Sequence, residues 1–84
     1  MRYSLNMISV HFYAAARSAA GANMLEMNAS TIDELRLILS GINSDFAKVL
    51  PTCTFLIDGE TCRDASKLIE NGARIDVLPR FSGG

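Results

Sequence analysis

Apolar and polar residues alternate near the start of the chain, which is the pattern of a strand with one buried face. Over residues 7–13, Ile8, Val10 and Phe12 share one side of the predicted strand. Residues 74–78 form a second, short apolar run that also predicts a strand. A continuous apolar run is typical of a strand that is buried on both faces, so we expect this last strand to lie in the middle of a sheet.

The sequence from Thr31 onward predicts a helix, because its apolar residues recur at helical spacing. Thr31 and Glu34 have the spacing of a capping box, with Thr31 as the N-cap. Gly41 is expected to end the helix. The apolar residues that follow the helical repeat form one stripe, which consists of Ile32, Leu35, Leu39 and Ile42.

Shorter segments fill the rest of the chain. They predict a short helix over residues 14–20, a strand over 24–27, a helical turn over 45–50 that Pro51 breaks, hairpin strands over 53–57 and 60–63, and a turn of helix over 66–69. Asp58-Gly59 and Asn71-Gly72 have the composition of tight turns. Because the helical segments lie in one central block, we predict an α+β fold. It is a single domain, residues 1–84, with the main helix across one face of a mixed sheet.

The predicted sheet has an inner and an outer face. The side chains expected in the core between sheet and helix are Phe12, Leu35, Ile57 and Val77. Alternate residues of a strand point to opposite faces, which places Tyr13 of the first strand and Leu78 of the last strand on the outer face. They are candidates for an exposed apolar patch. Such patches often mark partner surfaces, whereas single exposed apolar residues are ordinary.

Composition argues against several classes of function. The net charge is −1, and the eight basic residues are scattered, which argues against nucleic acid as a partner. No segment approaches the roughly 18 consecutive apolar residues of a membrane span. Polar residues also interrupt any signal-peptide core near the start, so we expect a cytoplasmic protein that does not bind membranes.

The side chains that usually carry catalysis are sparse. Cys53 and Cys62 flank the predicted hairpin in a diagonal position, about 7–8 Å apart, which is a poor disulfide distance. With one distant histidine, His11, they are too few for a zinc site. The acidic residues are dispersed. We therefore expect no autonomous enzymatic activity, no metal site and no directly bound cofactor.

The last two positions of the sequence are Gly83-Gly84. Glycine has no Cβ, so such a tail can enter a narrow channel. This suggests a chain whose terminal carboxylate is the reacting group, whereas most chain ends simply fray. We expect a flexible tail over residues 79–84, in which Pro79 ends the pairing of the sheet.

Four segments of the chain resemble the MoaD/ThiS family, and its MoaD branch in particular. They are residues 10–17, 31–35, 55–59 and, most specifically, 71–84. Arg80 stands where the family often has a second proline. The resemblance implies a ubiquitin-like β-grasp fold and the role of a sulfur carrier.

In that family, a partner of the ubiquitin-activating type (a MoeB-like adenylyltransferase) uses ATP to adenylate the terminal carboxylate, here that of Gly84. Sulfur then replaces the adenylate to leave a thiocarboxylate. The tail next enters the large subunit of molybdopterin synthase (MoaE-like), where sulfur passes to the dithiolene of molybdopterin. The resemblance and the outer parity together suggest the partner-binding residues, which are Gly83, Ser82, Phe81, Arg80, Leu78 and Tyr13.

Three other functions fit the same residues. Within the family, the chain would carry sulfur for thiamine, cysteine or tRNA. As a ubiquitin-like modifier, it would be joined through Gly84 to protein lysines. As a plain interaction domain, it would form neither product. A carrier accumulates as a thiocarboxylate and a modifier as isopeptide conjugates, which separates these alternatives.

Overall fold

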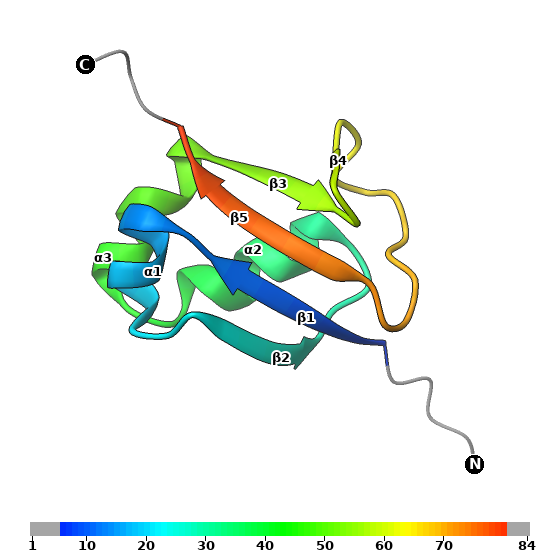
Figure 1. The fold of residues 1–84 in the computed structure, drawn as a ribbon, viewed down its shortest axis with the longest axis horizontal. Coiled ribbons are helices and arrows are strands. Elements are labelled where there is room, and N and C mark those ends of the chain that lie inside the picture. The colour runs from blue at the N-terminus through cyan, green and yellow to red at the C-terminus, as the bar shows by residue number, and fades with distance from the viewer. Residues whose placement is uncertain (1–5, 81–84) are drawn as a thin grey trace.

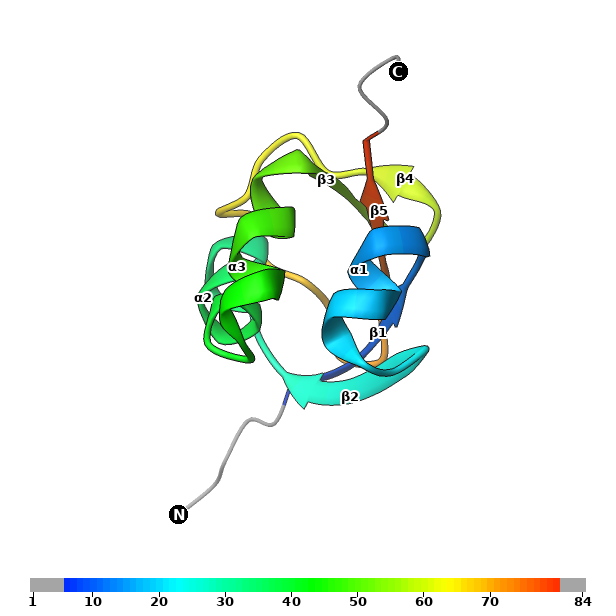
Figure 2. The same ribbon diagram turned by 90° about the vertical axis from the view of Figure 1, so that its left-hand side faces the viewer.

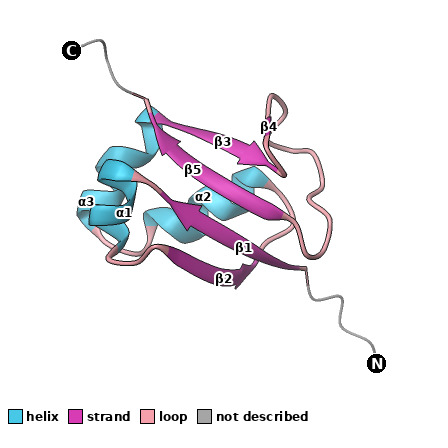
Figure 3. Cartoon of the chain, in the orientation of Figure 1, coloured by secondary structure: helices cyan, strands magenta, loops and turns pink. Residues whose placement is uncertain are grey.

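One five-stranded mixed sheet carries the helices on one face (Figure 1). The computed structural model describes residues 6–80 of the chain. Its elements are β1 (Met7–Phe12), α1 (Ala14–Ala20), β2 (Met24–Asn28), α2 (Ile32–Ser40), α3 (Ser44–Val49), the 3-10 helix η1 (Leu50–Thr52), β3 (Cys53–Ile57), β4 (Glu60–Thr61) and β5 (Arg74–Pro79). The predicted α+β class, with the main helix laid across the sheet, is confirmed (Figure 3).

The strands are ordered β2-β1-β5-β3-β4, so the last strand lies in the centre, as its apolar character predicts. β1 and β5 are parallel, with Val10 opposite Ile75 and Phe12 opposite Val77. All other neighbouring strands are antiparallel. Because β1 and β5 run in the same direction, the C-terminal end of β5 lies beside the C-terminal end of β1.

The main helix, α2, begins where the capping box predicts. The backbone N–H of Glu34 donates to Oγ1 of Thr31 at 3.1 Å, and its carboxylate accepts from the N–H of Ser30 at 2.6 Å. The buried residues of α2 are Ile32, Leu35 and Leu39. Ile42 was expected to extend this stripe but is 38% exposed, because the helix ends at Ser40 and the chain turns at Gly41.

The shorter helices differ from the predictions in two places. α3 ends at Val49, before Pro51, as predicted, but a 3-10 turn follows directly. Pro51 lies in the first turn of η1, where a backbone N–H needs no partner. Residues 66–69 do not form a turn of helix. Instead, Leu68 forms a β-bridge with Thr31, and the N–H of Ile69 donates to the carbonyl of Ser30 at 2.7 Å. These contacts connect the segment to the start of α2.

The core lies between the sheet and the helices, and Figure 2 shows α2 and α3 together on one side of the sheet. Phe12 of β1 meets Phe46 of α3 edge to face, with ring centroids 5.5 Å apart. Of the predicted core, Phe12, Leu35 and Val77 are buried. Ile57 is only half-buried, because β3 ends there and the chain enters the Asp58-Gly59 turn.

The hairpin forms at the predicted turn, with Ile57 opposite Glu60. Its second strand is shorter than the predicted range 60–63 and ends at Thr61. Within residues 6–80, no helix is long and apolar enough to cross a membrane.

Candidate functional site

The end of β5 is held in the sheet one residue further than expected. Pro79 lies opposite Cys53, and the N–H of Arg80 donates to the carbonyl of Thr52 at 2.7 Å. Bonded and non-bonded pairs alternate along an antiparallel ladder, so Pro79 takes a position whose N–H would point away from β3. The expectation that Pro79 ends the pairing was therefore wrong. Pro79 and Arg80, which were predicted to belong to the tail, are thus bonded to the sheet.

Four of the predicted site residues, Phe81, Ser82, Gly83 and Gly84, lie outside the described residues. Arg80, the last described residue, is exposed and directly follows the central strand β5. The reacting residue and most of the predicted tail contacts therefore remain predictions.

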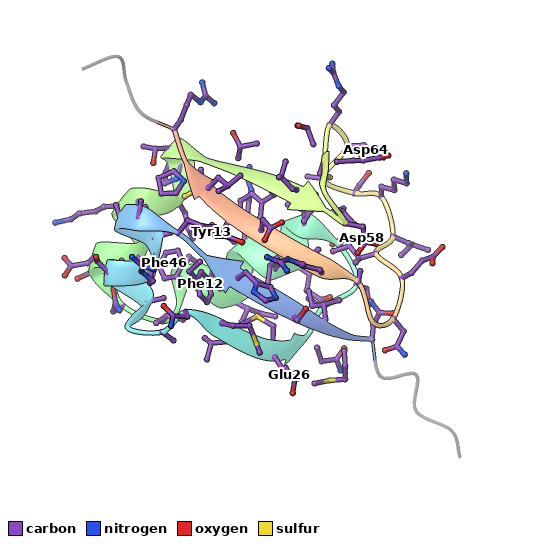
Figure 4. The ribbon with its side chains drawn as sticks, in the orientation of Figure 1. Phe12, Tyr13, Glu26, Phe46, Asp58 and Asp64 are labelled. Atoms are coloured by element: carbon purple, nitrogen blue, oxygen red, sulfur yellow. The ribbon has the colours of Figure 1, made fainter. Side chains whose placement is uncertain are left out.

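Tyr13 lies on the outer face of the sheet, but it is not a free apolar side chain. Its hydroxyl donates to Oδ1 of Asp76 at 2.8 Å. Arg74 donates from Nε to the same carboxylate oxygen at 3.1 Å and from Nη2 to the Tyr13 hydroxyl at 2.8 Å. These three residues form a closed polar triangle, which we call the Tyr13–Asp76–Arg74 triangle. Figure 4 labels the position of Tyr13.

The triangle makes a buried charge tolerable in the central strand. Asp76 is 9% exposed, and a carboxylate at that depth needs partners that offset its lost hydration. The hydrogen bond to Tyr13, and after it the one to Asp76, raises the pKa of the Arg74 guanidinium, whose positive charge offsets that of the carboxylate. Arg74 and Asp76 are also the one ion pair recorded within residues 6–80.

Leu78 shares the outer face, because it has the parity of Asp76 and not that of the buried Val77. It is half-buried and lies opposite Thr54 of β3. The structure thus brings Tyr13 and Leu78 to one face beside the end of β5. The surface between them is polar at Asp76, so the face is mixed and not a continuous apolar patch.

Sequence reasoning missed Arg74 and Asp76 as a connected pair with Tyr13. A signal for them was present, since Asp76 interrupts an apolar run in a strand expected to be central. A carboxylate in such a position needs partners on the neighbouring strands. The tyrosine that follows the first strand was therefore a candidate partner.

Both cysteines are free thiols. Cys53 is buried, and its Sγ donates to the carbonyl of Val49 at 3.4 Å. Burial raises the pKa of the Cys53 thiol above its ordinary value, and the hydrogen bond from Thr52 and the charge of Arg36 offset this rise in part. Cys53 is thus a neutral packing residue and not a reactive thiolate. Among residues 6–80, no cluster of three or more potential metal ligands is found.

Comparison with solved structures gives several matches across nearly the whole chain. Subunits 1 and 2 of molybdopterin-converting factor from Helicobacter pylori 26695 form one matched complex, with TM-score 0.72, 22% identity, and coverage of 93% of this chain and 99% of that chain. SAMP1, the small archaeal modifier protein 1 from Methanosarcina acetivorans, matches with TM-score 0.84, 21% identity, and coverage of 98% and 100%. Urm1 from Trypanosoma brucei matches with TM-score 0.61, 13% identity, and coverage of 99% and 100%. At these identities the matches confirm the ubiquitin-like β-grasp fold.

Among curated proteins, none matches the chain. The family comparison is more specific than the fold. The sequence model of the ThiS family matches residues 10–84, from the middle of β1 through the Gly83-Gly84 pair. The predicted resemblance to the MoaD/ThiS sulfur carriers is therefore confirmed, and the chain belongs to the ThiS family.

Proposed function

We propose that this chain is a cytoplasmic sulfur carrier and serves as the small subunit of a molybdopterin synthase. The observation that carries the proposal is the family match, which extends through the Gly83-Gly84 pair. The matched H. pylori structure supports it, because that structure contains a chain of the same fold in molybdopterin-converting factor.

The proposed reaction occurs in two steps at Gly84. In the first step, a carboxylate oxygen attacks the α-phosphorus of ATP, and pyrophosphate leaves, which gives an acyl-adenylate. In the second step, hydrosulfide attacks the carbonyl carbon, AMP leaves, and a proton is released, which gives the thiocarboxylate. A carboxylate is a poor electrophile, and adenylation supplies the leaving group that it lacks. ATP is thus a substrate of the activating partner and not a cofactor of this chain.

The central strand suits the delivery of such a tail. The N–H of Arg80, the last described residue, donates to the carbonyl of Thr52, and four residues follow it in the sequence. Four extended residues span at most about 14 Å. A partner's active site must therefore lie close to the end of β5. Glycine at the last two positions presents no side chain that would clash on the way in.

We infer that the outer face near the end of β5 contacts the partners. Leu78 and the ring of Tyr13, whose hydroxyl belongs to the polar triangle, supply its apolar surface. Phe81 anchors the tail in a partner groove, and Arg80 adds charge. The matched H. pylori structure supports a partner of the large-subunit kind, because it is a complex of the two subunits of molybdopterin-converting factor. The activating partner is proposed to be a MoeB-like adenylyltransferase.

The names of SAMP1 and of related matched structures favour a second candidate, a ubiquitin-like protein modifier. The experiment that separates the two uses the purified chain, its activating enzyme, ATP and hydrosulfide, followed by addition of a molybdopterin synthase large subunit with the sulfur-free pterin precursor. The proposal predicts a thiocarboxylate and then dithiolene formation. Conjugates through lysine isopeptide bonds in place of dithiolene formation would favour the modifier. Transfer to a thiazole synthase, and none to the large subunit, would favour the thiamine branch.

A further inference from the structure

A hollow of about 260 Å³ lies beside the end of β5, and three arginines line it. Arg36 comes from α2, Arg63 follows β4, and Arg80 follows β5. Phe55 and Cys53 of β3 contribute to its wall. We call this site the arginine hollow. It is separate from the Tyr13–Asp76–Arg74 triangle, none of whose residues lines it.

The positive charge of the arginine hollow is not neutralised within the described chain. No acidic side chain lines the hollow. None of its three arginines forms an ion pair or a side-chain hydrogen bond within residues 6–80, where Arg74–Asp76 is the recorded ion pair. Three of the eight basic residues of a chain with net charge −1 thus surround one small concave surface. Such a surface attracts anionic groups.

Arg36 is held in a position that suits binding. Its guanidinium carbon lies 5.1 Å from the ring centroid of Phe55, over the ring face. A guanidinium stacked in this way keeps its N–H donors at its edge, where a carboxylate can accept two of them. The stacking also limits the side-chain freedom that binding would otherwise remove.

The neighbouring edge of β3 offers a place for an extended backbone. β4 is two residues long and pairs only with Leu56 and Ile57. One further bond, from the N–H of Cys62 to the carbonyl of Phe55 at 2.9 Å, continues the contact. Toward Cys53, the described chain places no strand on this side of β3. The N–H of Cys53 donates to the carbonyl of Leu50, so the Phe55 N–H and the Cys53 carbonyl are the groups left there for pairing. An uncovered strand edge is a template for pairing with another extended segment.

We propose that the arginine hollow binds an extended acidic segment of a partner protein. The segment adds to the β3 edge through its backbone, and its carboxylates bind the guanidinium groups of Arg36, Arg63 and Arg80. We infer an acidic segment because the arginine hollow is positively charged. We infer a peptide, and not a small anion, because backbone groups at the β3 edge can pair with an extended chain. This inference does not require sulfur chemistry, because it concerns binding alone.

The test uses fluorescence anisotropy of a labelled peptide, Glu-Val-Glu-Val-Glu, titrated with the full chain. Its first control is the Gln-Val-Gln-Val-Gln peptide, which has the same shape without charge. A second control carries N-methyl groups on alternate backbone nitrogens and cannot add to a strand edge. We expect the acidic peptide to bind, added salt to weaken it, and both control peptides to bind at least about tenfold more weakly.

Matched variants locate the site on the protein. R36Q and R63Q should each weaken acidic-peptide binding on the order of tenfold. R17Q removes the same charge from the exposed surface of α1, outside the hollow, and should leave binding unchanged. Circular dichroism checks that each variant is folded. R63Q is the decisive variant if R36Q loses stability along with its contact to Phe55.

Three results would overturn the proposal. They are equal binding of the acidic and glutamine peptides, equal weakening by R17Q and R63Q, and inorganic phosphate that competes as well as the peptide does. The last result would identify a small-anion site. Undetectable binding of the acidic peptide at low salt would also contradict the proposal.

Discussion

The Tyr13 hydroxyl donates a 2.8 Å hydrogen bond to Asp76, a residue 63 positions later in the chain. The bond joins the residue just after β1 to the middle of the central strand. It satisfies a carboxylate that is only 9% exposed, and Arg74 completes the arrangement. The outer face beside the end of β5 is thus organised around a polar triangle, and Leu78 lies next to it.

Tyr13→Phe should lower the free energy of unfolding by about 1–3 kcal/mol, because Asp76 loses a hydrogen bond where water cannot fully replace it. Urea unfolding of the two proteins measures the difference. The control is the same change in an Asp76→Ala background, where the hydroxyl has no carboxylate to bind. An equal loss in both backgrounds would show that the bond to Asp76 contributes nothing to stability.

Leu35→Ala should lower the free energy of unfolding by about 2–5 kcal/mol, because it opens a cavity between α2 and the sheet. Leu37 provides a matched control on the same helix, since its side chain is 76% exposed and that of Leu35 is fully buried. Leu37→Ala should change stability by no more than about 0.5 kcal/mol. Thermal unfolding of both variants makes the comparison. Similar losses in the two would contradict the observed orientation of α2.

The two thiols should differ in reactivity. Cys53 is buried with a raised pKa, whereas Cys62 is half-buried, so iodoacetamide should modify Cys62 first in the folded protein. Peptide mapping after a short reaction locates the label. In denaturant, both should react at similar rates. Faster labelling of Cys53 in the folded chain would contradict its burial.

The raised pKa of Cys53 also predicts how stability depends on pH. The folded pKa lies above that of the unfolded chain, so the contribution is fully present below the unfolded pKa and is lost as pH rises through the folded pKa. Urea unfolding above about pH 8.5 should therefore show a loss of stability that Cys53→Ala reduces. If Cys53→Ala leaves the alkaline slope unchanged, the thiol is not its cause.

Partner binding and tail chemistry should be separable. Leu78→Ala and Phe81→Ala should each weaken association with the large subunit by about 1 kcal/mol or more, because apolar anchors dominate such interfaces. Deletion of Gly84 should have a smaller effect on association and stop sulfur transfer. Calorimetric titration of the large subunit measures the first effect. If Leu78→Ala and Phe81→Ala bind like the parent chain, the outer face near β5 is not the docking surface.

Local patterns predicted most of the fold. Alternation identified the buried face of β1, and the Thr31–Glu34 capping box located the start of α2. The short apolar run of β5 predicted its central place. These signals are local, because each depends on residues within one element.

The differences arise where distant segments meet. Residues 66–69 have the composition of a helical turn, but the bridge between Leu68 and Thr31 overrides that preference. Pro79 continues the sheet because the register between β3 and β5 directs its missing N–H away from β3. The Tyr13–Asp76 bond likewise depends on the register of β1 and β5. No local pattern encodes a register between strands so far apart in the chain.

The most direct test of the proposed function is the intact mass of the chain after incubation with its activating enzyme, ATP and hydrosulfide. The account predicts that one oxygen is replaced by sulfur, that fragmentation locates the sulfur at Gly84, and that omission of ATP prevents the exchange. A chain without Gly84 should fold, as unfolding by urea would show, and should take up no sulfur. Equal sulfur uptake by the truncated chain, or none by the intact chain while the enzyme releases pyrophosphate, would contradict the proposal that Gly84 carries the sulfur.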